Sequence, residues 1–96
     1  LLVKNQGLEK SKPIITLSGN GTIELIINNN SFLTYTFPEG ESSVVIDSIQ
    51  EEAYLDGIFK NRNMLGIFPI LEPGDNVITW SGTLTQIKVE PKSRWI

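Results

Sequence analysis

The chain has 96 residues with 8 basic and 11 acidic side chains, a formal net charge of -3, and neither cysteine nor histidine. This length suits one domain with one hydrophobic core. Binding of nucleic acid is disfavoured, because such binding needs clustered Lys and Arg, and here Lys88, Lys92 and Arg94 are interrupted by an acidic residue and a proline. Without cysteine there is neither a disulfide nor a thiolate metal site. A membrane span is not expected, since no apolar run approaches the ~18 residues that it needs.

Glycine and proline separate the apolar runs of the chain. The sequence holds 8 Gly and 5 Pro beside 40% hydrophobic residues, which is typical of short strands joined by turns. The first residue is Leu1 rather than an initiator Met, so we expect the C-terminal domain of a longer protein. Residues 1–96 are expected to form a single β-sandwich domain, in which residues 1–12 supply an edge strand and a connection.

The first hairpin is expected at Gly19-Asn20-Gly21, because Asn and Gly accept the positive φ of tight turns. Residues 14–18 are rich in β-branched side chains and predict the strand before it. Residues 22–27 predict the returning strand. Its period of two places three side chains on one buried face, namely Ile23, Leu25 and Ile27.

More turns and strands follow along the chain. Asn28-Asn29-Asn30 is expected to turn into a third strand at residues 31–37, whose alternation buries Leu33, Tyr35 and Phe37. The shorter expected elements are strands at 44–47, 51–55 and 58–60, turns at 38–41 and Asp56-Gly57, and a helical turn within 61–65 that Gly66 ends.

Residues 66–80 combine an irregular apolar segment with a strand. Pro69 and Pro73 lack an N–H donor and fix φ, so the segment cannot be regular structure. The Pro73-Gly74 pair is a turn signal that leads into a core strand at residues 76–80.

Phe68, Leu71 and Trp80 are the expected core side chains of that stretch. Phe68 and Leu71 are expected to plug the sandwich. Trp80 has the parity of Ile78, which places both on one face of the strand. We therefore predict that Trp80 is buried and that Trp80→Ala costs ~3–5 kcal/mol.

The last strand is expected at residues 83–90, after a turn at Ser81-Gly82, with Thr85, Ile87 and Val89 on one face. In total the sequence predicts about eight or nine strands at a spacing of ~8–12 residues. This pattern is typical of an all-β fold, an antiparallel β-sandwich or barrel.

No catalytic residues are expected. Without His or Cys the chain cannot assemble imidazole-based acid–base chemistry or a thiol nucleophile. The close acidic sets are Glu51-Glu52 and Glu39 with Glu41. Neighbouring strand residues point to opposite faces, so Glu51 and Glu52 do not converge, and Glu39 and Glu41 flank a turn glycine, where we expect them to be solvated. The domain is predicted not to be an enzyme.

No metal or cofactor is expected either. Asp47, Asp56 and Asp75 offer oxygen ligands, but calcium loops concentrate acidic residues at alternating positions. Asp56 and Asp75 stand beside glycines, where turns favour Asp. Gly19-Asn20-Gly21 begins like a dinucleotide fingerprint, but no helix pattern follows it.

The aromatic side chains leave a second function open, because a sheet-borne Trp with a neighbouring Tyr can stack on a sugar ring. The candidates beside Trp80 are Trp95, Tyr35 and Tyr54. Two of them on one open concave face would favour a carbohydrate-binding module, directed at a host cell wall or attached to an enzyme. Burial or scattering of these rings would disfavour it.

Three segments together resemble one protein family. The first is Asn5-Gln6-Gly7 with residues 13–19, and the second is Val45-Ile46-Asp47 with Tyr54. The third is the stretch from Gly66 to Ile78 with its Phe-Pro and Pro-Gly pairs, followed by Gly82 and residues 87–95. In this combination the chain resembles, over nearly its whole length, the C-terminal domain of the distal tail proteins of siphophages and of prophages of Gram-positive bacteria.

The resemblance implies a galectin-like, jelly-roll-like β-sandwich carried outside a ring that an N-terminal domain forms. It implies a structural protein of the virion tail, made in the cytoplasm of the bacterial host, whose homohexameric hub joins the tail tube to baseplate or tail-fibre proteins. The family has no catalytic residues. Galactoside binding is not implied, since the chain lacks the His of the galectin sugar site.

The oligomeric state and the competing functions follow from the same reasoning. We expect this fragment alone to be a monomer, because the ring-forming part is expected to lie outside it. The carbohydrate-binding module stays the alternative function. A third possibility is an accessory domain of an enzyme whose active site lies on another part of a longer chain.

Overall fold

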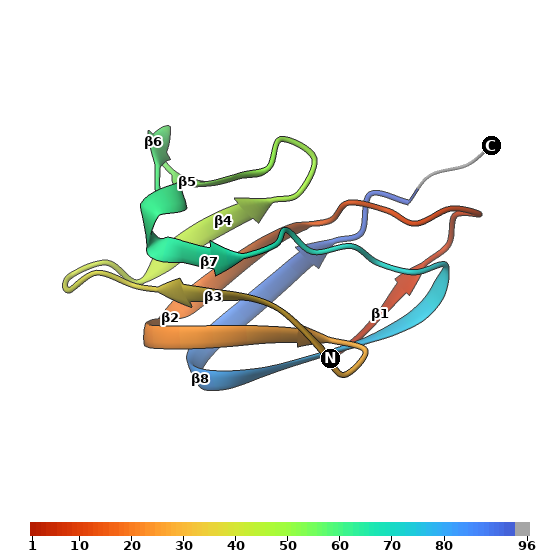
Figure 1. Cartoon of the computed structure of the whole chain (residues 1–96), viewed down its shortest axis with the longest axis horizontal. Coiled ribbons are helices and arrows are strands. Elements are labelled where there is room, and N and C mark those ends of the chain that lie inside the picture. Colours follow the sequence, from red (N-terminus) through yellow and green to blue (C-terminus); the bar gives the residue numbers. More distant parts are fainter. Residues whose placement is uncertain (94–96) are drawn as a thin grey trace.

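The computed structural model of the chain, in which residues 1–93 are described, consists almost entirely of antiparallel strands (Figure 1). One 3₁₀ turn, η1 (Asn61–Asn63), precedes β7. The eight strands are β1 (Leu2–Asn5), β2 (Ile14–Ile27), β3 (Asn30–Thr36), β4 (Ser43–Asp47), β5 (Glu52–Leu55), β6 (Ile58–Phe59), β7 (Met64–Gly66) and β8 (Gly74–Glu90). The predicted all-β sandwich of about eight strands is confirmed.

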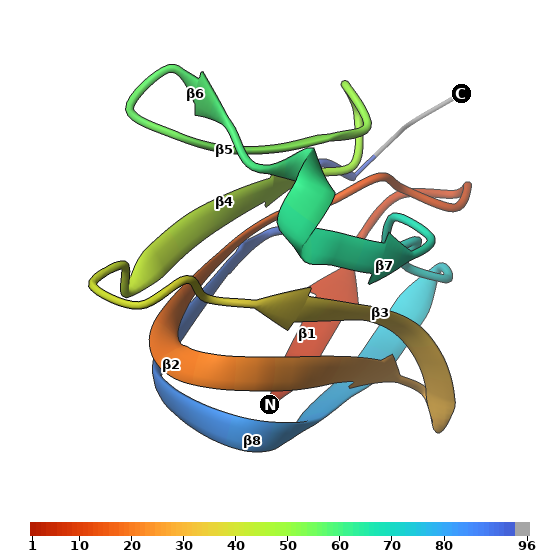
Figure 2. The same ribbon diagram turned by 60° about the vertical axis from the view of Figure 1, so that its left-hand side comes forward.

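Two long strands, β2 and β8, run side by side and bend together, so each contributes one half to either layer (Figure 2). In one layer the second half of β2 pairs with β3, which pairs with β7, and the first half of β8 pairs with β1. In the other layer the first half of β2 pairs with β4, followed by β5 and β6. The core lies between the layers.

The bend corrects two predicted turns. Residues 19–21 and 81–82 do not end strands, because β2 and β8 continue through them. The β2–β8 register shifts between Asn20 and Glu24 and again between Ser18 and Gly19. Glycine is needed at this corner, since a side chain on Gly19 or Gly82 would collide with the facing backbone of Thr83 or Thr22. The glycines that predicted two turns therefore mark the bend of two continuous strands.

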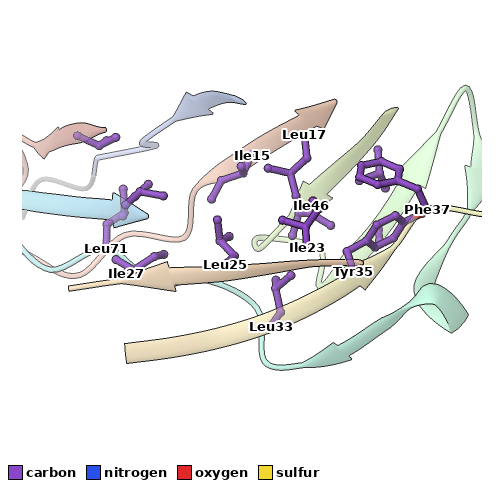
Figure 3. Packing of buried hydrophobic residues seen from close by; sticks show 14 residues of the cluster. Ile15, Leu17, Ile23, Leu25, Ile27, Leu33, Tyr35, Phe37, Ile46 and Leu71 are labelled. Carbon is purple, nitrogen blue, oxygen red and sulfur yellow. The ribbon is translucent and has the colours of Figure 1, made fainter. Parts of the chain in front are cut away.

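The core is built as the alternation predicts. Buried side chains of β2, β3, β4 and β8, together with Phe37 directly after β3, pack between the layers (Figure 3). The strand residues among them are Ile15, Leu17, Ile23, Leu25, Ile27, Leu33, Tyr35, Ile46 and Ile78. Tyr35 and Phe37 pack edge to face with ring centroids 5.0 Å apart. Such burial supplies the main stabilisation of a domain this small.

Two predicted hairpins are confirmed. Asn28 and Asn29 adopt positive φ of 53° and 65° between β2 and β3, as a tight hairpin turn requires. Asp56 and Gly57 do the same, at 51° and 80°, between β5 and β6. The predicted helical turn is the short η1, and Gly66 ends β7 rather than a helix.

The segment before β8 crosses one end of the sandwich, as expected. Leu71 is fully buried and Phe68 packs partly buried against the core. Leu71 and Ser11 exchange two backbone hydrogen bonds of 2.9 Å, which attach the crossover to the connection after β1.

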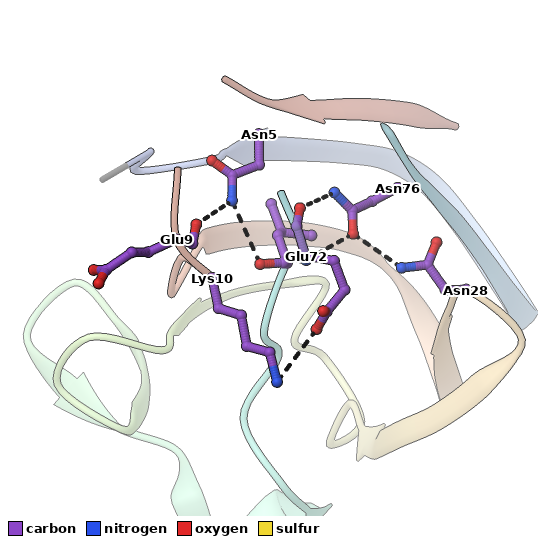
Figure 4. A network of polar contacts seen from close by, with 7 residues as sticks. Asn5, Glu9, Lys10, Asn28, Glu72 and Asn76 are labelled. Carbon is purple, nitrogen blue, oxygen red and sulfur yellow. Dashed lines mark hydrogen bonds and ion pairs between the residues drawn. The ribbon is translucent and has the colours of Figure 1, made fainter. Parts of the chain in front are cut away.

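Buried asparagines hold this crossover in place (Figure 4). The Asn76 side chain is fully buried. Its Oδ1 accepts hydrogen bonds from Glu72 N at 3.0 Å and from Asn28 Nδ2 at 2.9 Å. Its Nδ2 donates a hydrogen bond to Glu72 O at 2.9 Å. Asn5 Nδ2 donates to Glu9 O at 2.9 Å. Asn76 thus satisfies the backbone around the Pro73-Gly74 turn, and Asn5 satisfies a carbonyl of the connection after β1. A buried backbone group left unpaired would be costly.

Candidate functional site

The two halves of β8 differ in what covers their outer side. Residues Gly74–Val77 pair with β1. Ile78 adds two hydrogen bonds with Leu1, from Ile78 N to Leu1 O at 2.8 Å and from the Leu1 amino group to Ile78 O at 2.9 Å. From Thr79 to Glu90, β8 pairs with β2 alone among the residues that the structure describes. This second half is an exposed edge, which we name the open edge.

Every second residue of the open edge points its backbone N–H and C=O groups away from β2. Strand residues alternate in hydrogen-bond direction as they alternate in face. Ile78 faces the core and bonds outward to Leu1. Core-facing residues further along β8 therefore also direct N–H and C=O groups outward, where no described strand receives them.

Trp80 lies on this edge with its side chain on the core side. It stands directly opposite Leu25 of β2, which is fully buried, and residues directly opposite in an antiparallel pair share a face. Yet Trp80 is 37% exposed. The sequence thus predicted the correct face for Trp80, but the prediction that its side chain is buried was wrong. Pairing with β1 ends at Val77, so no neighbouring strand covers the outer side of β8 at the indole ring.

A shallow apolar groove surrounds Trp80. On one side a hollow of about 230 Å³ is lined by Leu1, Ile78, Thr79 and Trp80. On the other side a hollow of about 150 Å³ is lined by Trp80, Leu84, Thr85, Gln86 and Ile87. The indole separates the two hollows and contributes to both.

Half-buried aliphatic side chains continue the groove along β8. Leu84, Ile87 and Val89 pack against the core cluster but keep part of their surface exposed. Thr85 does not share their face as predicted: it is an extra residue, since Gln86 pairs with Ser18 and Leu84 with Gly19. This β-bulge sends the Thr85 hydroxyl to Ser18 O at 3.2 Å.

The two other aromatic candidates that the structure describes, Tyr35 and Tyr54, do not join Trp80. Tyr35 is 1% exposed within the core. Tyr54 stands opposite Val45, whose neighbours Val44 and Ile46 are buried, so Tyr54 faces outward on the opposite side of its sheet. Trp95 and Arg94 lie outside the described residues. The scattering of Trp80, Tyr35 and Tyr54 disfavours a stacked sugar site.

The acidic residues have structural surroundings. Asp47 Oδ1 accepts from the backbone of Ile49 at 3.0 Å and Gln50 at 3.1 Å, and so closes a turn. Glu41 forms an ion pair with Lys60, whose side chain is only 11% exposed. The expected solvation holds for the exposed Glu39 and only in part for Glu41, whose side chain is 31% exposed beside Lys60. Within residues 1–93 no His, Cys, Asp or Glu group gathers as metal ligands do.

A third hollow, of about 450 Å³, lies between Leu8, Glu9, Lys10 and Pro73. Its rim carries an exposed ion pair between Lys10 and Glu72 at 3.8 Å. Exposed pairs of this kind contribute little to stability. The hollow is a groove between two surface connections, lined by apolar Leu8 and Pro73 as well as by the charged Glu9 and Lys10.

The open edge can bind an extended polypeptide. Outward backbone groups offer hydrogen bonds to an added strand, and the Trp80 groove offers an apolar seat for its side chains. The sequence prediction missed this site, because it divided β8 at Gly82 and treated Trp80 as core. The alternation of residues 83–90 predicts which side chains share a face of the strand. It does not indicate whether the strand lies at the edge or in the middle of a sheet.

Comparison with protein-family models, curated proteins and solved structures finds no match for this chain. Among the described residues, no helix has the length and apolar character that crossing a membrane requires.

Proposed function

We propose that this domain is a structural, non-enzymatic binding module of a phage or prophage tail, the outward domain of the distal hub that connects the tail tube to baseplate or fibre proteins. The open edge carries the binding part of this proposal. It combines the outward backbone groups of alternate residues between Thr79 and Glu90 with a partly exposed Trp80 in an apolar groove. A half-buried Trp beside free backbone is typical of contacts between proteins.

The family part of the proposal is supported by the residues of the resemblance. The Asn5 turn and the stretch around Leu71 and Asn76 form one hydrogen-bonded unit. Those segments therefore specify a fold rather than a chemical centre, as a structural tail domain needs.

The proposal is tested on assembled tails. A phage or prophage gene carrying Trp80→Ser is expected to yield fewer complete tails, because the groove loses its central ring. The matched control is Phe59→Ser, which removes an aromatic ring that is 64% exposed at the end of β6. Antibody against the domain is expected to label the distal end of the tail tube. Labelling elsewhere on the particle, or equal assembly of both variants with the wild type, would contradict the proposal.

A carbohydrate-binding module remains the second candidate, because Trp80 is one exposed indole in a hollow. Titration with fragments of Gram-positive cell-wall polysaccharide, followed by Trp fluorescence, distinguishes the two. Saturable quenching that Trp80→Ala abolishes would favour sugar binding over the tail contact.

A further inference from the structure

We propose that the residues directly before Leu1 in the full-length protein continue β1 along β8 and cover Trp80, up to the point where β8 bends. This extension of β1 rests on the proposed function, because it needs the ring-forming part that precedes the domain in the same chain. The extension occupies one end of the open edge. The other end, residues 83–90, stays available to another tail protein.

The ladder between β1 and β8 runs beyond the first residue of β1 to Leu1. Leu1 and Ile78 exchange both backbone hydrogen bonds, at 2.9 Å and 2.8 Å, as a hydrogen-bonded pair of antiparallel strands does. The Leu1 nitrogen already donates to β8, and it keeps this donor when it becomes a peptide amide. A residue attached to it therefore continues the strand toward Thr79 and Trp80.

The register gives each preceding residue a partner. Because the strands are antiparallel and Leu1 lies opposite Ile78, the first residue before Leu1 lies opposite Thr79 and the second opposite Trp80. Hydrogen-bonded pairs recur at every second residue of such a ladder. The second preceding residue and Trp80 therefore form the next hydrogen-bonded pair, which satisfies the outward N–H and C=O groups of Trp80.

An apolar hollow lies at the position of that second residue. The hollow of about 230 Å³ is lined by Leu1, Ile78, Thr79 and Trp80, none of which is charged. Residues opposite each other share a face, so the second preceding side chain lies on the core side with the indole. Leu1 is 51% exposed and Trp80 is 37% exposed. An apolar side chain between them would remove part of this surface from water.

The bend of β8 limits the extension. At Ser81 and Gly82 the strand passes from the layer that contains β1 to the other layer (Figure 2), and Gly82 has φ +98°. A straight strand that continues β1 cannot follow this change of layer, so the extension ends opposite Trp80. The hollow on the other side of the indole, which Leu84 and Ile87 help to line, stays open.

The extension predicts residue types in the full-length sequence. The second residue before Leu1 is expected to be apolar, because it lies in the hollow beside Trp80. The first is expected to be polar or β-branched, because its partner Thr79 is exposed on the outer face. Proline at the second position would contradict the inference, since that residue has to donate its N–H to Trp80 O.

The test compares the 96-residue chain with a chain that begins four residues earlier in the full-length protein. Exchange of single amides is followed by nuclear magnetic resonance. In the longer chain the Trp80 amide is expected to exchange at least about tenfold more slowly than in the 96-residue chain, because it gains a backbone acceptor. The Ile87 amide, which also points outward but lies beyond the bend, is expected to keep its rate.

Two proline variants of the longer chain locate the contact. Proline at the second position before Leu1 removes the donor to Trp80 O and is expected to restore fast exchange of the Trp80 amide. Proline at the fourth position, past the end of the extension, is expected to leave that exchange slow. Fast exchange of Trp80 in the longer chain, or equal rates in both variants, would overturn the inference.

The extension and the proposed function can fail separately. Antibody labelling at the distal end of the tail together with an unprotected Trp80 amide in the longer chain would overturn the extension alone. Labelling elsewhere on the particle together with a protected Trp80 amide would overturn the proposed function alone.

Discussion

The two halves of β8 belong to one continuous strand and have different surroundings. In the first half, β1 covers the outer side, Ile78 is fully buried and Asn76 is surrounded by hydrogen-bond partners. In the second half, the same strand has one neighbour, and Trp80, Leu84 and Ile87 keep exposed surface. A strand can thus be structural at one end and a contact surface at the other, depending on where its neighbour ends.

The largest expected effect lies in the covered half. Ile78→Ala is expected to destabilise the domain by about 3 to 4 kcal/mol, because it removes a fully buried side chain and leaves a cavity. Denaturant unfolding measures the change. A loss below about 1 kcal/mol would show that β1 does not seal this half.

The bend of β8, which lies within the open half, gives the next effect. Gly82 has φ +98°, and an added Cβ would collide with Thr22 O. Gly82→Ala is therefore expected to cost about 3 kcal/mol. Gly57→Ala is the matched control, since Gly57 also has positive φ, +80°, but open space around it. It is expected to cost about 1 kcal/mol. Equal losses in thermal unfolding would mean that the corner has room for a side chain.

Removal of the buried amide tests the anchoring of the covered half. Asn76→Ala is expected to cost about 2 to 3 kcal/mol, because Glu72 N loses its acceptor and Asn28 Nδ2 loses its partner. Asn20→Ala, at an exposed position, is expected to change stability by less than about 0.5 kcal/mol. Similar values for both in urea unfolding would argue against the network of Figure 4 as an anchor.

The smallest effect is expected in the open half. Trp80→Ala is expected to cost the dilute domain about 1 to 2 kcal/mol, less than a buried aromatic ring, because the ring is 37% exposed and its loss encloses no cavity. Unfolding followed by circular dichroism measures this. A loss of about 4 kcal/mol would restore the sequence-based expectation that Trp80 is core.

Local patterns predicted much of the fold and little of the site. Alternation identified the buried faces of β2 and β3, and Asn28-Asn29 identified a hairpin, because both depend on neighbours along the chain. Gly82 was read as a turn, since positive φ serves a bend and a turn equally. The exposure of Trp80 depends on where β1 ends, a contact between residues far apart in sequence. No local signal carries that information.

Hydrogen exchange along β8 tests the central claim most directly, that β1 covers one part of this strand and leaves the rest as an open edge. The Ile78 amide, bonded to Leu1, is expected to be protected from exchange. The amides of Trp80, Ile87 and Val89, which point away from β2, are expected to exchange much faster. Protection of these three amides equal to that of Ile78 would contradict the account.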